Sequence, residues 1–148
     1  MKPIVLLALM LTPAAVWGQA QECRFENGTL NGAYALTITG TAGSPVWTAS
    51  TGPVATIGMI VFDGMGNFQV AASTIVGANP PLNVTVPGVI TGSYTVNQDC
   101  SGTLTFNFTP NPNAHYNNMV VSPNGGWATM IATDKGDVLT GTATRLRG

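Results

Sequence analysis

The stretch VITGSYTVNQDCSGTLTFNFT, residues 89–109, predicts the fold, because apolar and polar residues alternate along both of its halves. Strict alternation over five or more residues is typical of a strand with one buried face and one wet face. We therefore expect strands at 89–97 and 103–109. The segment between them, QDCSG at 98–102, is rich in turn-forming residues, so the two strands should form a hairpin.

Segments rich in Val, Ile, Thr and aromatic residues recur about every twelve residues from position 33 onward, separated by Gly, Asn, Asp and Pro. They span 33–40, 54–62, 68–76, 114–122, 127–133 and 138–146. The prolines at 80, 81 and 87 predict a long loop with at most a short edge strand around Val84.

Helical periodicity is absent, so these segments predict an all-β domain with about eight strands joined mostly by hairpins. We expect a single antiparallel, mostly up-and-down eight-stranded barrel, because closure removes exposed sheet edges. A β-sandwich is the alternative, since strand patterns alone do not distinguish two open sheets from a closed one.

Charge is scarce in this chain and excludes several classes of protein. Its 148 residues include five Lys or Arg and six Asp or Glu, a charged fraction of 7%. Soluble domains average roughly 25%. Five basic residues cannot supply the positive surface that phosphate backbones need, so we expect no nucleic-acid partner.

The first 20 residues predict a secretory signal peptide. Lys2 precedes an apolar run at 4–11, and small residues follow up to Ala20. The domain prediction is therefore a signal at 1–20 and a single barrel domain at 21–148. We expect a secreted or periplasmic protein with no membrane span after signal cleavage, since the apolar run is too short for an anchor.

The two cysteines of the chain, Cys23 and Cys100, both follow the predicted signal. Exported proteins meet oxidants, so we predict a Cys23–Cys100 disulfide. Closing a loop of this length stabilises a fold by roughly 4 kcal/mol through chain entropy. A metal-binding thiol pair is not supported, because the chain has no CxxC motif and His115 is its one histidine.

Three stretches carry a resemblance to a known group of proteins: FDGMGNF at 62–68, GSYTVNQDCSGTLTF at 92–106 and GTATR at 141–145. They resemble small exported bacterial proteins of unknown function, which are themselves similar to the calycin-like barrel of allene oxide cyclases and dirigent proteins. The resemblance implies an eight-stranded antiparallel barrel whose lumen can hold an apolar ligand. It implies no activity, and no residue of the plant cyclases is carried over.

Five residues are candidates for ligand binding: Tyr34, Tyr94, Phe106, His115 and Trp127. The four aromatic residues lie on faces that alternation marks as apolar, where they either fill a core or line a pocket. An eight-stranded barrel is close to the size at which side chains just fill the interior, and we favour core filling. His115 either projects into the lumen as a polar anchor or lies exposed near a strand end, and we favour exposure.

Other chemistry is poorly supported. The acidic segments 63–67 and 134–137 have too few oxygen ligands for calcium, so we interpret them as turns and assign no metal or cofactor. One histidine with no nucleophile motif does not make a triad. The acidic residues all lie in the leader or in turns, which disfavours a carboxylate pair in a cleft.

These observations leave three hypotheses. The first is an exported barrel that binds a small, mainly apolar molecule in its lumen. The second is a cyclase or isomerase of the allene oxide cyclase type, in which Tyr94 or His115 would take part. The third is a structural or surface-interaction protein with a solid core. A protein without catalytic activity is favoured over an enzyme.

Overall fold

The computed structural model describes residues 22–43, 52–77, 82–85, 90–107 and 114–147. The predicted signal peptide, the ends of two predicted strands at 89 and 108–109, and the prolines of the predicted loop at 80, 81 and 87 lie outside this range. The elements are a 3-10 turn, η1 (Glu26–Thr29), and the strands β1 (Asn31–Ala42), β2 (Gly52–Asp63), β3 (Asn67–Gly77), β4 (Leu82–Thr85), β5 (Ile90–Val96), β6 (Ser101–Asn107), β7 (Ala114–Val121), β8 (Trp127–Ala132) and β9 (Val138–Arg145).

Eight of these strands close into a ring. The order is β2-β1-β9-β8-β7-β6-β5-β3, and β3 pairs with β2 to complete it. All of the pairings are antiparallel. The prediction of an all-β, eight-stranded up-and-down barrel is therefore confirmed, and the sandwich alternative is wrong, because each of the eight strands has two neighbours.

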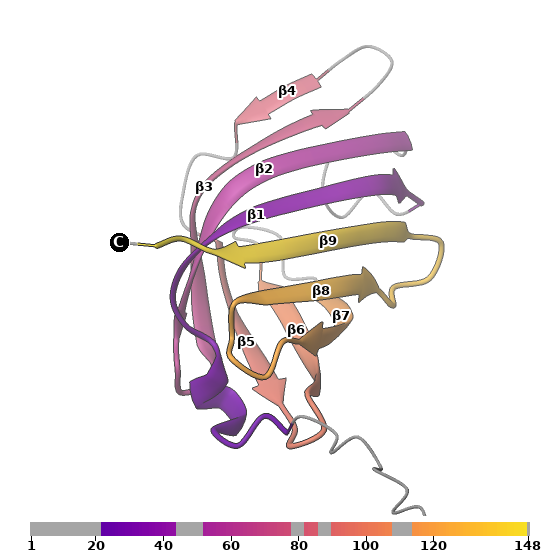
Figure 1. Cartoon of the computed structure of the whole chain (residues 1–148). Helices are drawn as coiled ribbons and strands as arrows, with labels where there is room; N and C mark the ends of the chain where they lie inside the picture. The colour runs from indigo at the N-terminus through magenta and orange to yellow at the C-terminus, as the bar shows by residue number, and fades with distance from the viewer. Residues whose placement is uncertain (1–21, 44–51, 78–81, 86–89, 108–113, 148) are drawn as a thin grey trace, which may run out of the picture.

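The ninth strand, β4, pairs with β3 alone and lies at the edge of the barrel (Figure 1). Along β3 the partner changes, from β5 over Asn67–Val70 to β4 over Thr74–Gly77. The register with β2 shifts by one residue between these two stretches. Such a bulge bends a strand and increases its twist, which fits the change of partner. The short edge strand expected around Val84 is confirmed.

Every second side chain along a strand faces the interior, and near η1 several of these inward side chains are aromatic. Phe62 lies at the centre, with its ring centroid 5.2 Å from that of Tyr34, 5.0 Å from Tyr94 and 5.9 Å from Phe68. Phe68 in turn lies 5.0 Å from Phe106. All five rings are buried. At these spacings the rings are in van der Waals contact, so this part of the barrel is packed rather than hollow.

The segment 22–30, here called the plug, covers the barrel end near these rings (Figure 1). Cys23 and Cys100 form the predicted disulfide, which joins the plug to the β5–β6 turn. The Cys23 amide donates to Gln98 at 2.9 Å, and the Val96 amide donates to the Asn27 side chain at 2.8 Å. The plug therefore takes the place of a neighbouring strand for backbone groups at this end.

Two tyrosines and an arginine form further hydrogen bonds at the barrel end that the plug covers. The Tyr94 hydroxyl lies 2.9 Å from the carbonyl oxygens of both Asn27 and Leu30. Arg145, from the end of β9, donates to the Tyr34 hydroxyl at 3.0 Å and to the Asn31 carbonyl at 3.1 Å. Its guanidinium also lies 5.4 Å from the centre of the Tyr34 ring, within reach of a cation–π interaction.

Replacing both cysteines by serine is expected to lower the free energy of unfolding by about 4 kcal/mol, because the disulfide closes a long loop in the unfolded chain. Urea denaturation of the oxidised protein and of the double variant measures the difference. A loss below about 1 kcal/mol would show that the hydrogen bonds of the plug hold it without the disulfide.

Candidate functional site

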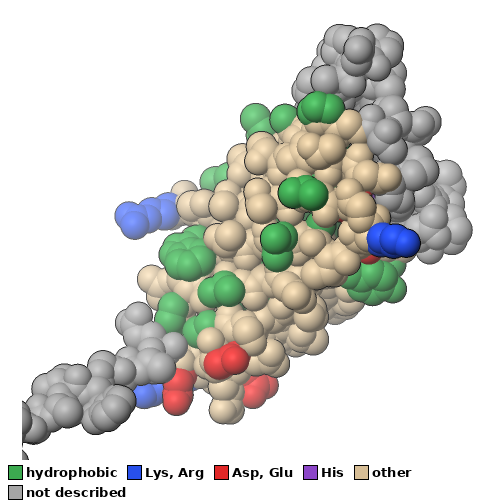
Figure 2. All heavy atoms as spheres, turned by 90° about the vertical axis from the view of Figure 1, so that its right-hand side faces the viewer, with side chains coloured by type: hydrophobic (Ala, Val, Ile, Leu, Met, Phe, Trp, Pro, Cys, Tyr) green, Lys and Arg blue, Asp and Glu red, His purple; other side chains and the backbone are tan. Residues whose placement is uncertain are grey.

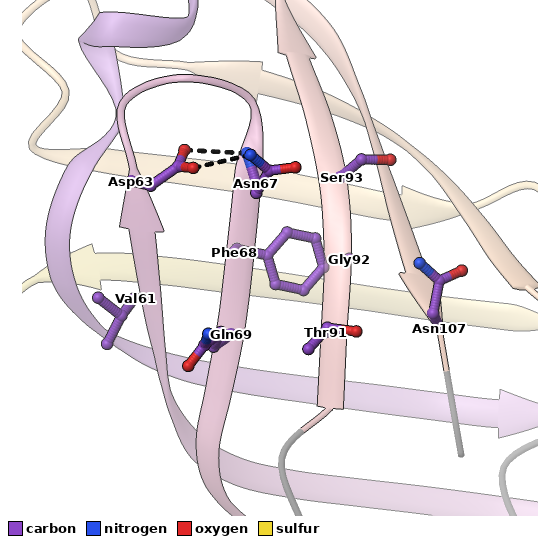
Figure 3. Close-up of a pocket in the computed structure, with 9 residues that line it drawn as sticks. All are labelled: Val61, Asp63, Asn67, Phe68, Gln69, Thr91, Gly92, Ser93 and Asn107. Atoms are coloured by element: carbon purple, nitrogen blue, oxygen red, sulfur yellow. Dashed lines mark hydrogen bonds between the residues drawn. The ribbon is translucent and has the colours of Figure 1, made fainter. Parts of the chain in front are cut away.

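A groove on the outer wall of the barrel crosses β2, β3, β5 and β6 (Figure 3). Its volume is about 520 Å³. The residues that line it are Val61, Asp63, Asn67, Phe68, Gln69, Thr91, Gly92, Ser93 and Asn107. Ligand pockets typically have volumes of roughly 300–1,000 Å³, so this groove can hold a small molecule.

Cross-strand register explains why these residues gather. Val61 pairs with Gln69, Gln69 with Thr91, and Thr91 with Asn107, which makes one row across four strands. Residues in register on one face of a sheet lie about 5 Å apart, so their side chains form a continuous surface. Apart from Val61, this row offers amide and hydroxyl groups that both donate and accept hydrogen bonds.

Gly92 is the position in the groove lining where the backbone approaches the aromatic core most closely. It is the cross-strand partner of Phe68, whose ring lies beside it in Figure 3. A Cβ atom at position 92 would collide with the Phe68 ring and with the Thr105 carbonyl oxygen. Glycine is therefore required there, because the buried Phe68 ring packs against the bare backbone from the interior. The apolar side chain that the groove exposes is Val61, which is 38% exposed.

The one carboxylate of the groove is held in a turn. Asp63 accepts hydrogen bonds from the Asn67 side chain at 2.8 Å and from the amides of Asn67 and Met65 at 2.9 and 2.7 Å. These hydrogen bonds lower the pKa of Asp63 below its usual value, and the bond from the Asn67 side chain has the largest effect. Asp63 is therefore an ionised, locally bonded group and a poor general acid at neutral pH.

Three of the five residues predicted to bind a ligand lie in the packed interior. Tyr34 and Tyr94 both contact Phe62, and Phe106 contacts Phe68. The two tyrosine hydroxyls face the plug end, where they bond to backbone oxygens and to Arg145. The structure thus gives these three residues a packing role.

Trp127 corrects the sequence analysis, because it faces outward and is 47% exposed. Its neighbours Ala128 and Met130 face the interior instead. The segment WATMIA carries apolar residues on both faces, so alternation alone could not decide which face is buried. Pairing of Trp127 with Thr144 on β9, whose side chain is also exposed, fixes the outward face.

His115 is a second correction, because the expected exposed histidine is buried, with 1% of its surface exposed. It shares the inner face of β7 with Asn117 and Met119. Its Nδ1 atom lies 2.9 Å from Asp134 Oδ2 and 3.8 Å from Asp137 Oδ2. The local sequence predicts that these two aspartates are turn residues, and nothing in that pattern relates them to a histidine about twenty residues earlier.

The rest of the outer wall is mostly uncharged. On the face in Figure 2, hydrophobic side chains are separated by polar and backbone surface, and few charged side chains appear. Threonines of β1, β8 and β9 form a shallow depression of about 160 Å³, in which the hydroxyls of Thr37 and Thr142 lie 2.8 Å apart. These hydroxyls bond to each other, so the depression is a weaker candidate than the groove.

Comparison with known proteins adds no relative: no protein-family model, curated protein or solved structure matches this chain. No helix among the described residues has the length and apolar character to cross a membrane. The fold and the groove geometry therefore carry the functional argument.

Ionisation of Tyr94 makes the stability of the folded protein depend on pH in the alkaline range. Burial, which disfavours the phenolate, is the main cause that raises the pKa of Tyr94 from 10.0 to about 12. The unfolded chain ionises first, so this contribution to stability is complete below pH 10 and is lost as pH rises from 10 to 12.

We expect Tyr94→Phe to be less stable than the wild type at pH 7, by about 1 kcal/mol, because the hydroxyl bonds to the plug are lost. Between pH 10 and 12 its stability should decline less than that of the wild type. Urea denaturation across this range tests both effects, with Tyr116→Phe as a control that removes an exposed hydroxyl outside the plug. Parallel curves for wild type and Tyr94→Phe would contradict the assignment.

Proposed function

We propose that this protein is a binding protein without catalytic activity, and that its outer groove holds a small uncharged organic molecule with both hydroxyl groups and an apolar face. The single observation that carries the proposal is the groove of about 520 Å³ with the exposed Val61 side chain in its lining and amide and hydroxyl side chains around it. A pocket with an apolar surface and a few placed polar groups is typical of small-molecule sites.

The polar groups of the groove favour an uncharged ligand. Asn67, Gln69, Ser93 and Asn107 can each form hydrogen bonds without carrying charge. The hydroxyl groups of such a ligand could bond to these side chains, while its apolar face lies against Val61. An anionic ligand is disfavoured, because Asp63 is ionised and lies in the lining.

A binding role fits the groove better than catalysis. General acid–base chemistry needs a group that exchanges protons near the working pH. Asp63 is the one acidic or basic residue in the lining, and its lowered pKa keeps it ionised. The amide and hydroxyl groups around it can orient a ligand but supply no proton at neutral pH.

The barrel interior is the second candidate site, and here the resemblance to the calycin-like allene oxide cyclase barrel applies. That resemblance would place an apolar ligand in the lumen. One observation favours it: Thr56, on the inner face of β2, is buried, and its hydroxyl has no hydrogen-bond partner among the described residues. A ligand with one polar group could satisfy it. A secreted or periplasmic location is part of the proposal, supported by the disulfide.

Native mass spectrometry of the exported protein, purified gently, tests the proposal. We expect added mass that is lost on denaturation. Thr91→Trp would fill the middle of the groove and abolish the added mass, while Asn118→Trp, on the exposed face of β7, would keep it. A protein that carries no added mass and binds no neutral glycoside or polyol in solution would contradict binding.

The same measurement separates the two sites. Added mass that survives in Thr91→Trp but disappears in Thr56→Val would move the ligand from the groove to the lumen, because valine removes the buried hydroxyl at nearly constant volume. Added mass that survives in both variants would place the ligand at neither site.

A further inference from the structure

The barrel end opposite the plug brings together ionisable groups that are scarce in this chain. The sequence has six acidic residues and one histidine. The histidine and two of the acidic residues, His115, Asp134 and Asp137, place one ligand atom each within 4.8 Å of one another. Asp134 and Asp137 share a turn, so their proximity is expected, but His115 comes from the start of a different strand.

The local fold holds these atoms in place. The β8–β9 turn contains Gly136 at φ 91°, a conformation that glycine adopts readily. The turn lies against Gly43, where a Cβ atom would collide with the Gly136 carbonyl oxygen, and the Gly43 amide donates to Asp137 Oδ1 at 2.8 Å. The Tyr116 amide donates to Asp134 Oδ2 at 3.1 Å. Each carboxylate is thus oriented by a backbone amide.

Burial and charge make this cluster unusual for a turn. The side chains of His115 and Asp137 are 1% and 0% exposed, and that of Asp134 is 20% exposed. Buried carboxylates cost free energy unless a positive charge lies beside them. A divalent ion bound between the three side chains would supply two positive charges to the two carboxylates.

We propose that His115 Nδ1, Asp134 and Asp137 bind one divalent transition-metal ion, for which Zn²⁺ is the test ion. Ligand atoms about 2.1 Å from a tetrahedral ion lie about 3.4 Å from one another. The two distances from Nδ1 to the carboxylate oxygens, 2.9 and 3.8 Å, bracket that value. One imidazole nitrogen with two carboxylate oxygens suits zinc, and three protein ligands leave a position for water.

The proposed ion would join the start of β7 to the β8–β9 turn. It would reach the site past Asp134, the most exposed of the three side chains. This site is separate from the groove, which has no lining residue in common with it. Zinc binding and ligand binding in the groove can therefore succeed or fail independently.

Isothermal titration of ZnCl₂ into the purified, oxidised and metal-stripped chain tests the site without any organic ligand. We expect one Zn²⁺ per chain and a higher melting temperature with zinc. Loss of a residue that only orients a metal ligand, without touching the metal, typically costs roughly 10–100-fold in affinity. His115→Gln and Asp137→Asn, which remove ligands, should therefore weaken binding by more than about 100-fold.

Asp134→Asn is the variant least disruptive to the fold, because the side chain is partly exposed. The asparagine oxygen can still accept the hydrogen bond from the Tyr116 amide. It should weaken zinc binding while near-ultraviolet circular dichroism and the disulfide mass stay unchanged. Asp99→Asn, in the β5–β6 turn at the plug end, is the matched control and should bind zinc like the wild type. No zinc binding at millimolar concentration, or equal affinity in wild type and His115→Gln, would overturn the proposal.

Discussion

Closure of the sheet through the β2–β3 ladder is the constraint on which the rest of the structure depends. Once the ring is closed, one face of the sheet becomes the interior of the barrel and the other its outer wall, and a slip of one residue would exchange the two faces. The bulge in β3 lets that strand pair with β5 near the plug and with β4 farther on. The aromatic core, the plug and the outer groove are all arranged on this closed ring.

The strands and the disulfide could be predicted because their signals are local or compositional. Alternation in 89–109 depends on neighbouring residues alone, and pairing of two cysteines in an exported chain requires no geometry. Trp127 and His115 lie at strand ends, where few neighbours define a face. For His115 the deciding contact is with a turn 19 residues further along the chain. Local patterns carry no information about such a contact.

The groove could not be predicted from the sequence for a related reason. Its central row takes one residue from each of four strands, and which residues share the row depends on the register of three ladders. Gly92 was visible as a glycine within a strand, a known sign of close packing by a neighbour. Its partner, Phe68, could be identified only once β3 and β5 were known to pair. The chemistry of each lining residue was readable, but their assembly was not.

The acidic residues show how the two barrel ends differ. At the plug end, Asp63 and Asp99 accept hydrogen bonds from residues of their own turns, and those bonds lower both pKa values. At the opposite end, Asp134 and Asp137 lie in a similar turn but face a buried histidine from another strand. A carboxylate that stabilises its own turn is satisfied locally. Two carboxylates that converge on a buried imidazole create a negative site inside the fold, and the charge that balances them decides what this end of the barrel can bind.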